Sequence, residues 1–175
     1  SEIDDVIKKL KDLIEELERE VKEMSDENKR LLEEIEERVK EAIKRSKDTL
    51  EEIADRVRKK GPDKEIEELI REDKKRIKDV LKELRELVAR TKKRVDDVTK
   101  KLREEARKIE EEIRRRLSDK DKATKIEKDL RDVLRKIEKT MEDNRRENEE
   151  LLKKVEEEVR RLEEETEKVL RDLRR

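Results

Sequence analysis

The side chains that most enzymes use for acid–base, nucleophilic or zinc chemistry are largely missing from this chain. It has no histidine, cysteine or aromatic residue, so Ser–His pairs, Cys–His pairs and zinc sites built from nitrogen and sulfur ligands are excluded. Carboxylates are abundant, but they alternate with Lys and Arg in the pattern of solvated i,i+4 ion pairs. Asp73 is the exception, because it falls among apolar positions. Since neither a cleft nor a partner base is evident, we interpret Asp73 as structural and predict no catalytic, metal or cofactor site.

Uncharged polar side chains also occupy positions where the pattern otherwise places Leu, Ile or Val. A buried polar group without a partner costs about 1–3 kcal/mol, whereas a satisfied network penalises every wrong register. We therefore predict that these residues and Asp73 form hydrogen-bond layers between helices. The alternative is that Ser and Thr at the edge of the stripe are simply partly exposed. The uncharged members are Ser25, Asn28, Ser46, Thr49, Thr91, Thr99, Thr140, Asn144, Asn148 and Thr166.

The apolar residues that must position these side chains recur every 18 residues, as in Ile3, Val21, Val39 and Val57. Five turns of an α-helix also contain about 18 residues. A seven-residue repeat would impose a left-handed supercoil and an eleven-residue repeat a right-handed one. The 18-residue repeat therefore predicts long, straight helices.

Two breaks divide this pattern into helices over about 2–60, 63–117 and 121–174. At the first break, Gly61 suits the left-handed position after a helix, Pro62 cannot extend that helix, and Asp63 can cap the next one. The second break, residues 118–121, has no glycine but three short polar residues that favour caps and turns. Each helix would be about 80 Å long at 1.5 Å per residue.

Short connections require consecutive helices to run antiparallel. An apolar arc of about 120–140° suits a helix that faces two neighbours. The predicted fold is therefore all-α: one antiparallel, coiled-coil-like three-helix bundle over residues 1–175. Residues at the same height on the first and second helices should have numbers that add to about 122. For the second and third helices, the sum should be about 240. The predicted layers are Asn28 with Thr91 and Asn148; Asp73 with Ser46, Thr49 and Thr166; and Thr99 with Thr140 and Ser25.

The composition of the chain limits the kinds of binding partner that we expect. Charged residues make up 62% of the chain, yet the formal net charge is only −1, which gives little drive toward nucleic acid or anionic membranes. We expect a soluble chain that binds neither, although the compartment stays unknown. Because no second apolar face is left, a monomer that requires no partner is favoured. The alternatives are a homodimer formed by helix swapping and a six-helix assembly.

The straight 18-residue phasing, the Ile/Leu/Val core, the Glu/Lys/Arg surface, the Gly61-Pro62-Asp63 turn and the matched polar layers resemble those of de novo designed antiparallel three-helix bundles. Such bundles are generated parametrically and carry buried hydrogen-bond networks. The resemblance implies a hyperstable monomeric scaffold without a natural biochemical function. The alternative is a natural or engineered coiled-coil interaction module, such as a spectrin-like tether or a switch component. Natural modules of this kind usually include aromatic residues, Gln and His, which are absent here.

Overall fold

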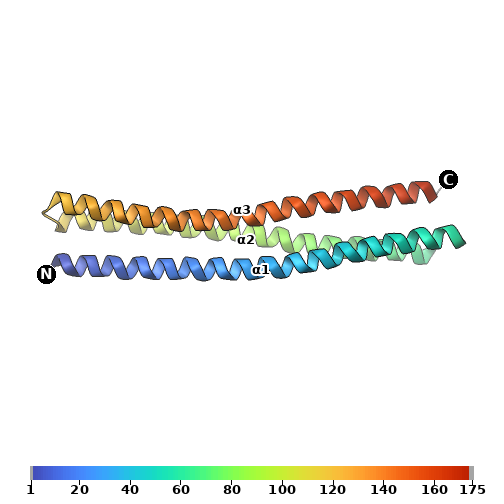
Figure 1. Ribbon diagram of the computed structural model, residues 1–175, viewed down its shortest axis with the longest axis horizontal. Helices are drawn as coiled ribbons and strands as arrows, with labels where there is room; N and C mark the ends of the chain where they lie inside the picture. The colour runs from blue at the N-terminus through green and yellow to red at the C-terminus, as the bar shows by residue number, and fades with distance from the viewer. Residues whose placement is uncertain (1, 174–175) are drawn as a thin grey trace. The chain divides into compact units, whose positions relative to one another are not determined.

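The computed structural model describes the backbone of residues 2–173 and the side chains of residues 4–172. It contains three helices: α1 (Glu2–Lys60), α2 (Lys64–Arg116) and α3 (Lys120–Leu173) (Figure 1). No strand occurs in this described range. The all-α three-helix fold is thus confirmed. The observed helix ends lie within one residue of the predicted ones, and the predicted end at residue 174 falls outside the described residues.

The turn between α1 and α2 follows the local chemistry of its residues. Gly61 has a φ of 78°, and its N–H donates to the carbonyl of Val57 at 2.9 Å, which closes α1 with a left-handed cap. Asp63 then accepts a hydrogen bond from the Ile66 N–H at 3.0 Å. That contact is an N-terminal cap, as predicted for this residue.

The turn between α2 and α3 reverses the chain without a glycine. Asp119 Oδ1 accepts hydrogen bonds from the N–H groups of Asp121 at 3.1 Å and Lys122 at 3.4 Å. Its own carbonyl accepts from the Ala123 N–H at 3.1 Å. Asp119 is therefore the N-cap of α3, and the cap replaces the missing glycine as the local stop signal.

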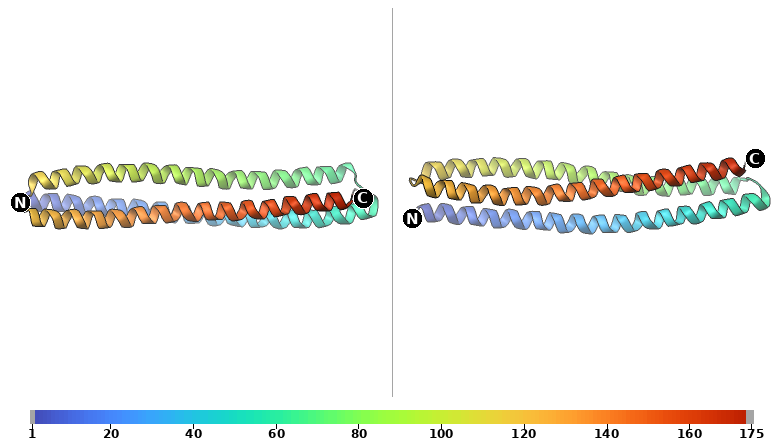
Figure 2. Two further views of the ribbon diagram at one scale, coloured as in Figure 1. Left: turned by 90° about the horizontal axis from the view of Figure 1, so that it is seen from above. Right: turned by 45° about the horizontal axis from the view of Figure 1, so that its top comes forward.

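The chain divides into two compact units. Unit 1 comprises Ser1–Lys29 and Arg90–Arg146, and unit 2 comprises Arg30–Ala89 and Glu147–Arg175. Each unit contains a segment of all three helices. In unit 1 the turn between α2 and α3 lies beside the start of α1, and in unit 2 the turn between α1 and α2 lies beside the end of α3 (Figure 2). A single domain over 1–175 stays a prediction.

Ion pairs between helices define the antiparallel registers within each unit. Between α1 and α2 they are Arg94–Glu27 in unit 1, and Arg38–Glu83 and Arg56–Glu65 in unit 2; their residue numbers add to 121. Between α2 and α3 they are Arg114–Glu127, Arg131–Glu110 and Arg103–Glu138 in unit 1, and Arg85–Glu156 in unit 2; these add to 241. Both registers lie within one residue of the predicted values.

Each unit has its own apolar core. In unit 1 the fully buried side chains include Leu102, Ile113, Leu130 and Met141. In unit 2 the largest cluster is centred on Leu84 and draws on all three helices. A second cluster of unit 2 combines Ile53 and Val57 of α1 and Ile66 of α2 with the half-buried Leu69 and Ile70.

Candidate functional site

Hydrogen bonds between uncharged polar side chains join different helices in unit 1. Thr91 Oγ1 of α2 donates to Asn28 Oδ1 of α1 at 3.2 Å. Ser25 Oγ of α1 donates to Asn144 Oδ1 of α3, also at 3.2 Å. The first pair is one that the registers predicted. The second is not, because the predicted layers placed Ser25 with Thr99 and Thr140.

The polar cluster of unit 2 is built around Asp73, whose side chain is 15% exposed. The buried Ser46 hydroxyl of α1 donates to Asp73 Oδ2 at 2.7 Å. Arg76 Nη2, one turn along α2, donates to Asp73 Oδ1 at the long distance of 3.5 Å. Arg76 also carries the one buried side-chain nitrogen or oxygen among the described residues that lacks a hydrogen-bond partner, its Nε. The serine contact is therefore the shorter and stronger of the two.

The pairs Asn28–Thr91 and Ser46–Asp73 occupy equivalent positions one repeat apart, although the donor lies on α2 in the first pair and on α1 in the second. Ser46 follows Asn28 by 18 residues along α1, and Asp73 precedes Thr91 by 18 along α2. The 18-residue repeat therefore places polar side chains on both helices at matching heights.

Asn148 is fully buried within unit 2. Its amide is not among the unsatisfied buried groups of the described chain. A buried amide costs little only when its donors and acceptor are satisfied, so this residue has the environment that a network member requires. Membership of a layer with Asn28 and Thr91 stays a prediction.

The remaining threonines are less closely tied to the interior. Thr140 is exposed, and its hydroxyl donates to the Lys136 carbonyl of its own helix at 3.1 Å, so the structure does not place it in a buried layer. Thr166 is half-buried and donates to the Leu162 carbonyl at 2.7 Å rather than to Asp73. Thr49 and Thr99 are half-buried. The error for Thr140 has a physical reason: a threonine can satisfy its hydroxyl within its own helix.

A groove of about 510 Å³ opens beside Asp73 in unit 2. Its lining comes from all three helices and is largely apolar, with Leu50 and Ile53 from α1, Ile77 and Leu81 from α2, and Leu170 from α3. The carboxylate of Asp73 and the hydroxyls of Ser46 and Thr166 are the polar groups among its buried and half-buried lining residues. This combination is typical of small-molecule sites, which are mostly apolar with a few polar groups.

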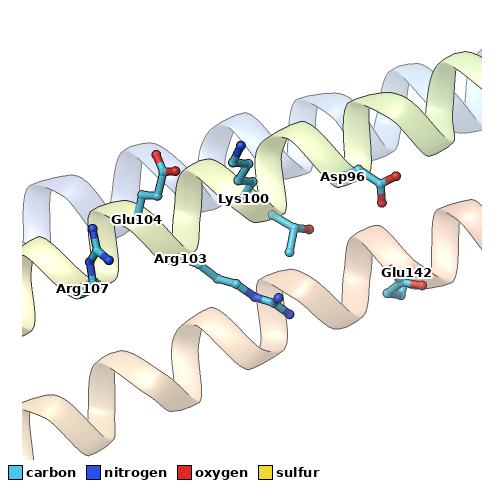
Figure 3. Close-up of a pocket in the computed structure, with 7 residues that line it drawn as sticks. Asp96, Lys100, Arg103, Glu104, Arg107 and Glu142 are labelled. Carbon is cyan, nitrogen blue, oxygen red and sulfur yellow. The ribbon is translucent and has the colours of Figure 1, made fainter.

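A second hollow, of about 500 Å³, lies on the surface of unit 1 and is almost entirely charged. Figure 3 shows Arg103 reaching from α2 toward α3, while Lys100 and Glu104 point away from α3. Arg103 pairs with Glu138 at 3.2 Å, and Thr99 is the one uncharged lining residue. Its acids and bases are solvated and mixed in sign, so this hollow is an ordinary charged surface.

Within the described residues, no group of three or more Asp or Glu side chains is arranged to hold a metal ion. No helix in the described range combines the length and apolar character that a membrane span requires. The groove of unit 2 and the polar pairs between helices are therefore the features on which a functional proposal can be built.

No protein-family model matches the chain, and no curated protein matches it. Among solved structures it is similar to one described as a computationally designed three helix bundle. The sequence identity is 18%, the match covers 98% of this chain and 88% of that chain, and the TM-score is 0.45. The three-helix architecture described above follows from this chain's own helices and registers.

Proposed function

We propose that this protein is a designed, monomeric structural scaffold whose polar pairs between helices specify a single register. The observation that carries the proposal is that hydrogen-bonded polar pairs, Asn28–Thr91 and Ser46–Asp73, recur at equivalent positions 18 residues apart on each helix. A one-residue slip would move these side chains away from their partners. Because an unpaired buried polar group costs about 1–3 kcal/mol, such pairs disfavour wrong registers more than they strengthen the right one.

The surface of the bundle supports the monomeric part of this proposal. No large apolar side chain is exposed among residues 4–172, so the helices present no broad apolar face to a second chain. Stable interfaces normally bury about 800 Å² on each partner around an apolar centre. The proposal assigns the protein no catalytic role, because the acids and bases of the exposed faces lie mixed with one another and form ion pairs.

Two measurements on the intact chain test the scaffold proposal. Multi-angle light scattering should give the mass of one chain, 21.4 kDa. Circular dichroism during heating should show helicity that persists above about 90 °C, the range of hyperstable proteins. A mass of about twice the chain's would replace the monomer with a swapped or six-helix dimer and would favour an interaction module. Cooperative melting well below that temperature would count against an idealised design.

A further inference from the structure

The groove of unit 2 coincides with an interruption in a series of ion pairs between α2 and α3. In both units the pairs whose residue numbers add to 241 join an arginine to a glutamate, as in Arg85–Glu156 at 3.3 Å. The next two level pairs toward the end of α3 are Lys78 with Glu163 and Lys74 with Glu167. All four of these side chains line the groove and are exposed. Among the described residues no ion pair joins them, so the helices are not bridged there.

Apolar side chains of all three helices lie beneath this interruption. Leu50 and Ile53 of α1, Ile77 of α2 and the half-buried Leu170 of α3 line the groove. The missing ion pairs between α2 and α3 therefore leave an apolar floor between two rows of charged side chains.

The dimensions of the groove suit a slender ligand. Along α2 its lining runs from Ile70 to Arg85, which spans about 22 Å at 1.5 Å per residue. A docked helix would need a continuous exposed apolar stripe, whereas no large apolar side chain is exposed in the described range. An alkyl chain needs only a narrow apolar channel between the two rows of charged side chains.

The charges of the lining residues determine which ligand head group the groove can bind. The unpaired charges of the rim cancel, since Lys74 and Lys78 face Glu163 and Glu167, and Arg85 already pairs with Glu156. The charged group among the half-buried lining residues is the carboxylate of Asp73, which Arg76 approaches at 3.5 Å without itself lining the groove. A carboxylate has about four lone-pair sites, and Asp73 accepts one hydrogen bond on each oxygen, the one on Oδ1 at 3.5 Å. Asp73 therefore has spare capacity to accept a hydrogen bond from inside the groove.

From this geometry we propose that the groove binds single-chain alkylammonium ligands, with the alkyl chain along the apolar lining and the ammonium group on Asp73 Oδ1. Both an ammonium and an alcohol can donate a charge-assisted hydrogen bond to the carboxylate, but the ammonium adds the attraction of opposite charges and should be preferred at the same chain length. A carboxylate head has no proton to donate to Asp73 and carries the same charge. The groove would discriminate in this way whether or not the protein serves as a scaffold.

Calorimetric titration of the intact protein with n-octylammonium, 1-octanol and n-octanoate at neutral pH tests the proposal. Octylammonium should bind at one site about fivefold or more tighter than octanol, because it adds the attraction of opposite charges to the hydrogen bond that both can donate, and octanoate should bind weakest. Methyl NMR shifts should be confined to groove residues such as Ile77 and Leu170. Equal binding of octanoate and octylammonium, shifts spread over both units, or no binding by any of the three would overturn it.

Three variants separate the parts of the proposal. Asp73→Asn should remove the preference for the ammonium while leaving the affinity for octanol within about twofold. Leu81→Phe places a larger side chain in the groove and should weaken all three ligands. The same change at Leu134, a half-buried core residue of unit 1, should leave binding unchanged. Helicity is measured for each variant, and affinities unaltered in folded Asp73→Asn and Leu81→Phe proteins would refute the site.

The groove could instead be covered by a second copy of the chain. In that case light scattering would give twice the chain's mass, and the groove methyl resonances would shift on dilution. That pair of results would assign the groove to self-association and would overturn the ligand site.

Discussion

Removal of the Ser46 hydroxyl tests whether the buried polar pair of unit 2 stabilises the fold. Ser46 is 4% exposed and its hydroxyl donates to Asp73 at 2.7 Å. A hydrogen bond to a charged group contributes about 1.5–3 kcal/mol to the free energy of unfolding. The lower end of that range applies because Asp73 borders the open groove, where water can replace the lost donor. Alanine is a better helix former than serine by roughly 0.5 kcal/mol, which offsets part of the loss.

Ser46→Ala should therefore lower the free energy of unfolding by about 1 kcal/mol. Replacing both partners, as in Ser46→Ala with Asp73→Leu, should cost less than the two single changes added together, because neither half of the Ser46–Asp73 pair is left unsatisfied, although Arg76 loses its carboxylate partner. Guanidinium unfolding followed by circular dichroism at 222 nm measures each variant, and the midpoint and slope together give the free energy.

The double-mutant cycle decides the outcome. A coupling energy of about 1 kcal/mol between the two positions supports a formed pair, since positions without a shared contact add within about 0.3–0.5 kcal/mol. If Ser46→Ala were neutral or stabilising and the two changes were additive, the reasoning from the 2.7 Å contact would be refuted.

Three further changes examine other parts of the structure. Thr91→Val removes the hydroxyl that donates to Asn28 and should lower the free energy of unfolding by about 1 kcal/mol; an unchanged denaturation midpoint would contradict a role for that contact. Lys74→Arg with Lys78→Arg should extend the arginine–glutamate series across the groove, raising stability by about 0.2–1 kcal/mol per pair and weakening octylammonium binding. The gain should disappear in 1 M salt, and a gain that persists there would indicate another cause. Thr140→Ala should alter the free energy of unfolding by less than about 0.5 kcal/mol, because the residue is exposed; a larger loss would place Thr140 in a layer after all.

The registers between the helices could be predicted from local sequence patterns. The 18-residue repeat establishes which face of each helix is apolar, and two short turns establish the heights at which residues meet. Together they predicted that Asn28 lies near Thr91 and that Asp73 lies near Ser46, as observed. Asp63 was likewise predicted to cap α2.

Side-chain partners were harder to predict than heights. Ser25 pairs with Asn144 of α3 instead of Thr99, and Thr140 turns to its own helix. Spacing alone does not predict these choices, because several acceptors lie within one turn of the same height and each hydroxyl can also bond within its helix. Arg76, the second partner of Asp73, was missed, although its position one turn along the same helix was a usable signal.

The sequence by itself determined the helices, their caps, their antiparallel order and the heights of the polar side chains, because these follow from backbone periodicity and short connections. The tertiary structure decided where the three helices pack fully and where they leave a groove. Lateral packing depends on all three helices at once, and it fails to close above Asp73, where the lysines and glutamates of α2 and α3 face each other without forming ion pairs. The sequence predicted a register of about 240 between α2 and α3, and the tertiary structure decided which arginine–glutamate pairs of that register form.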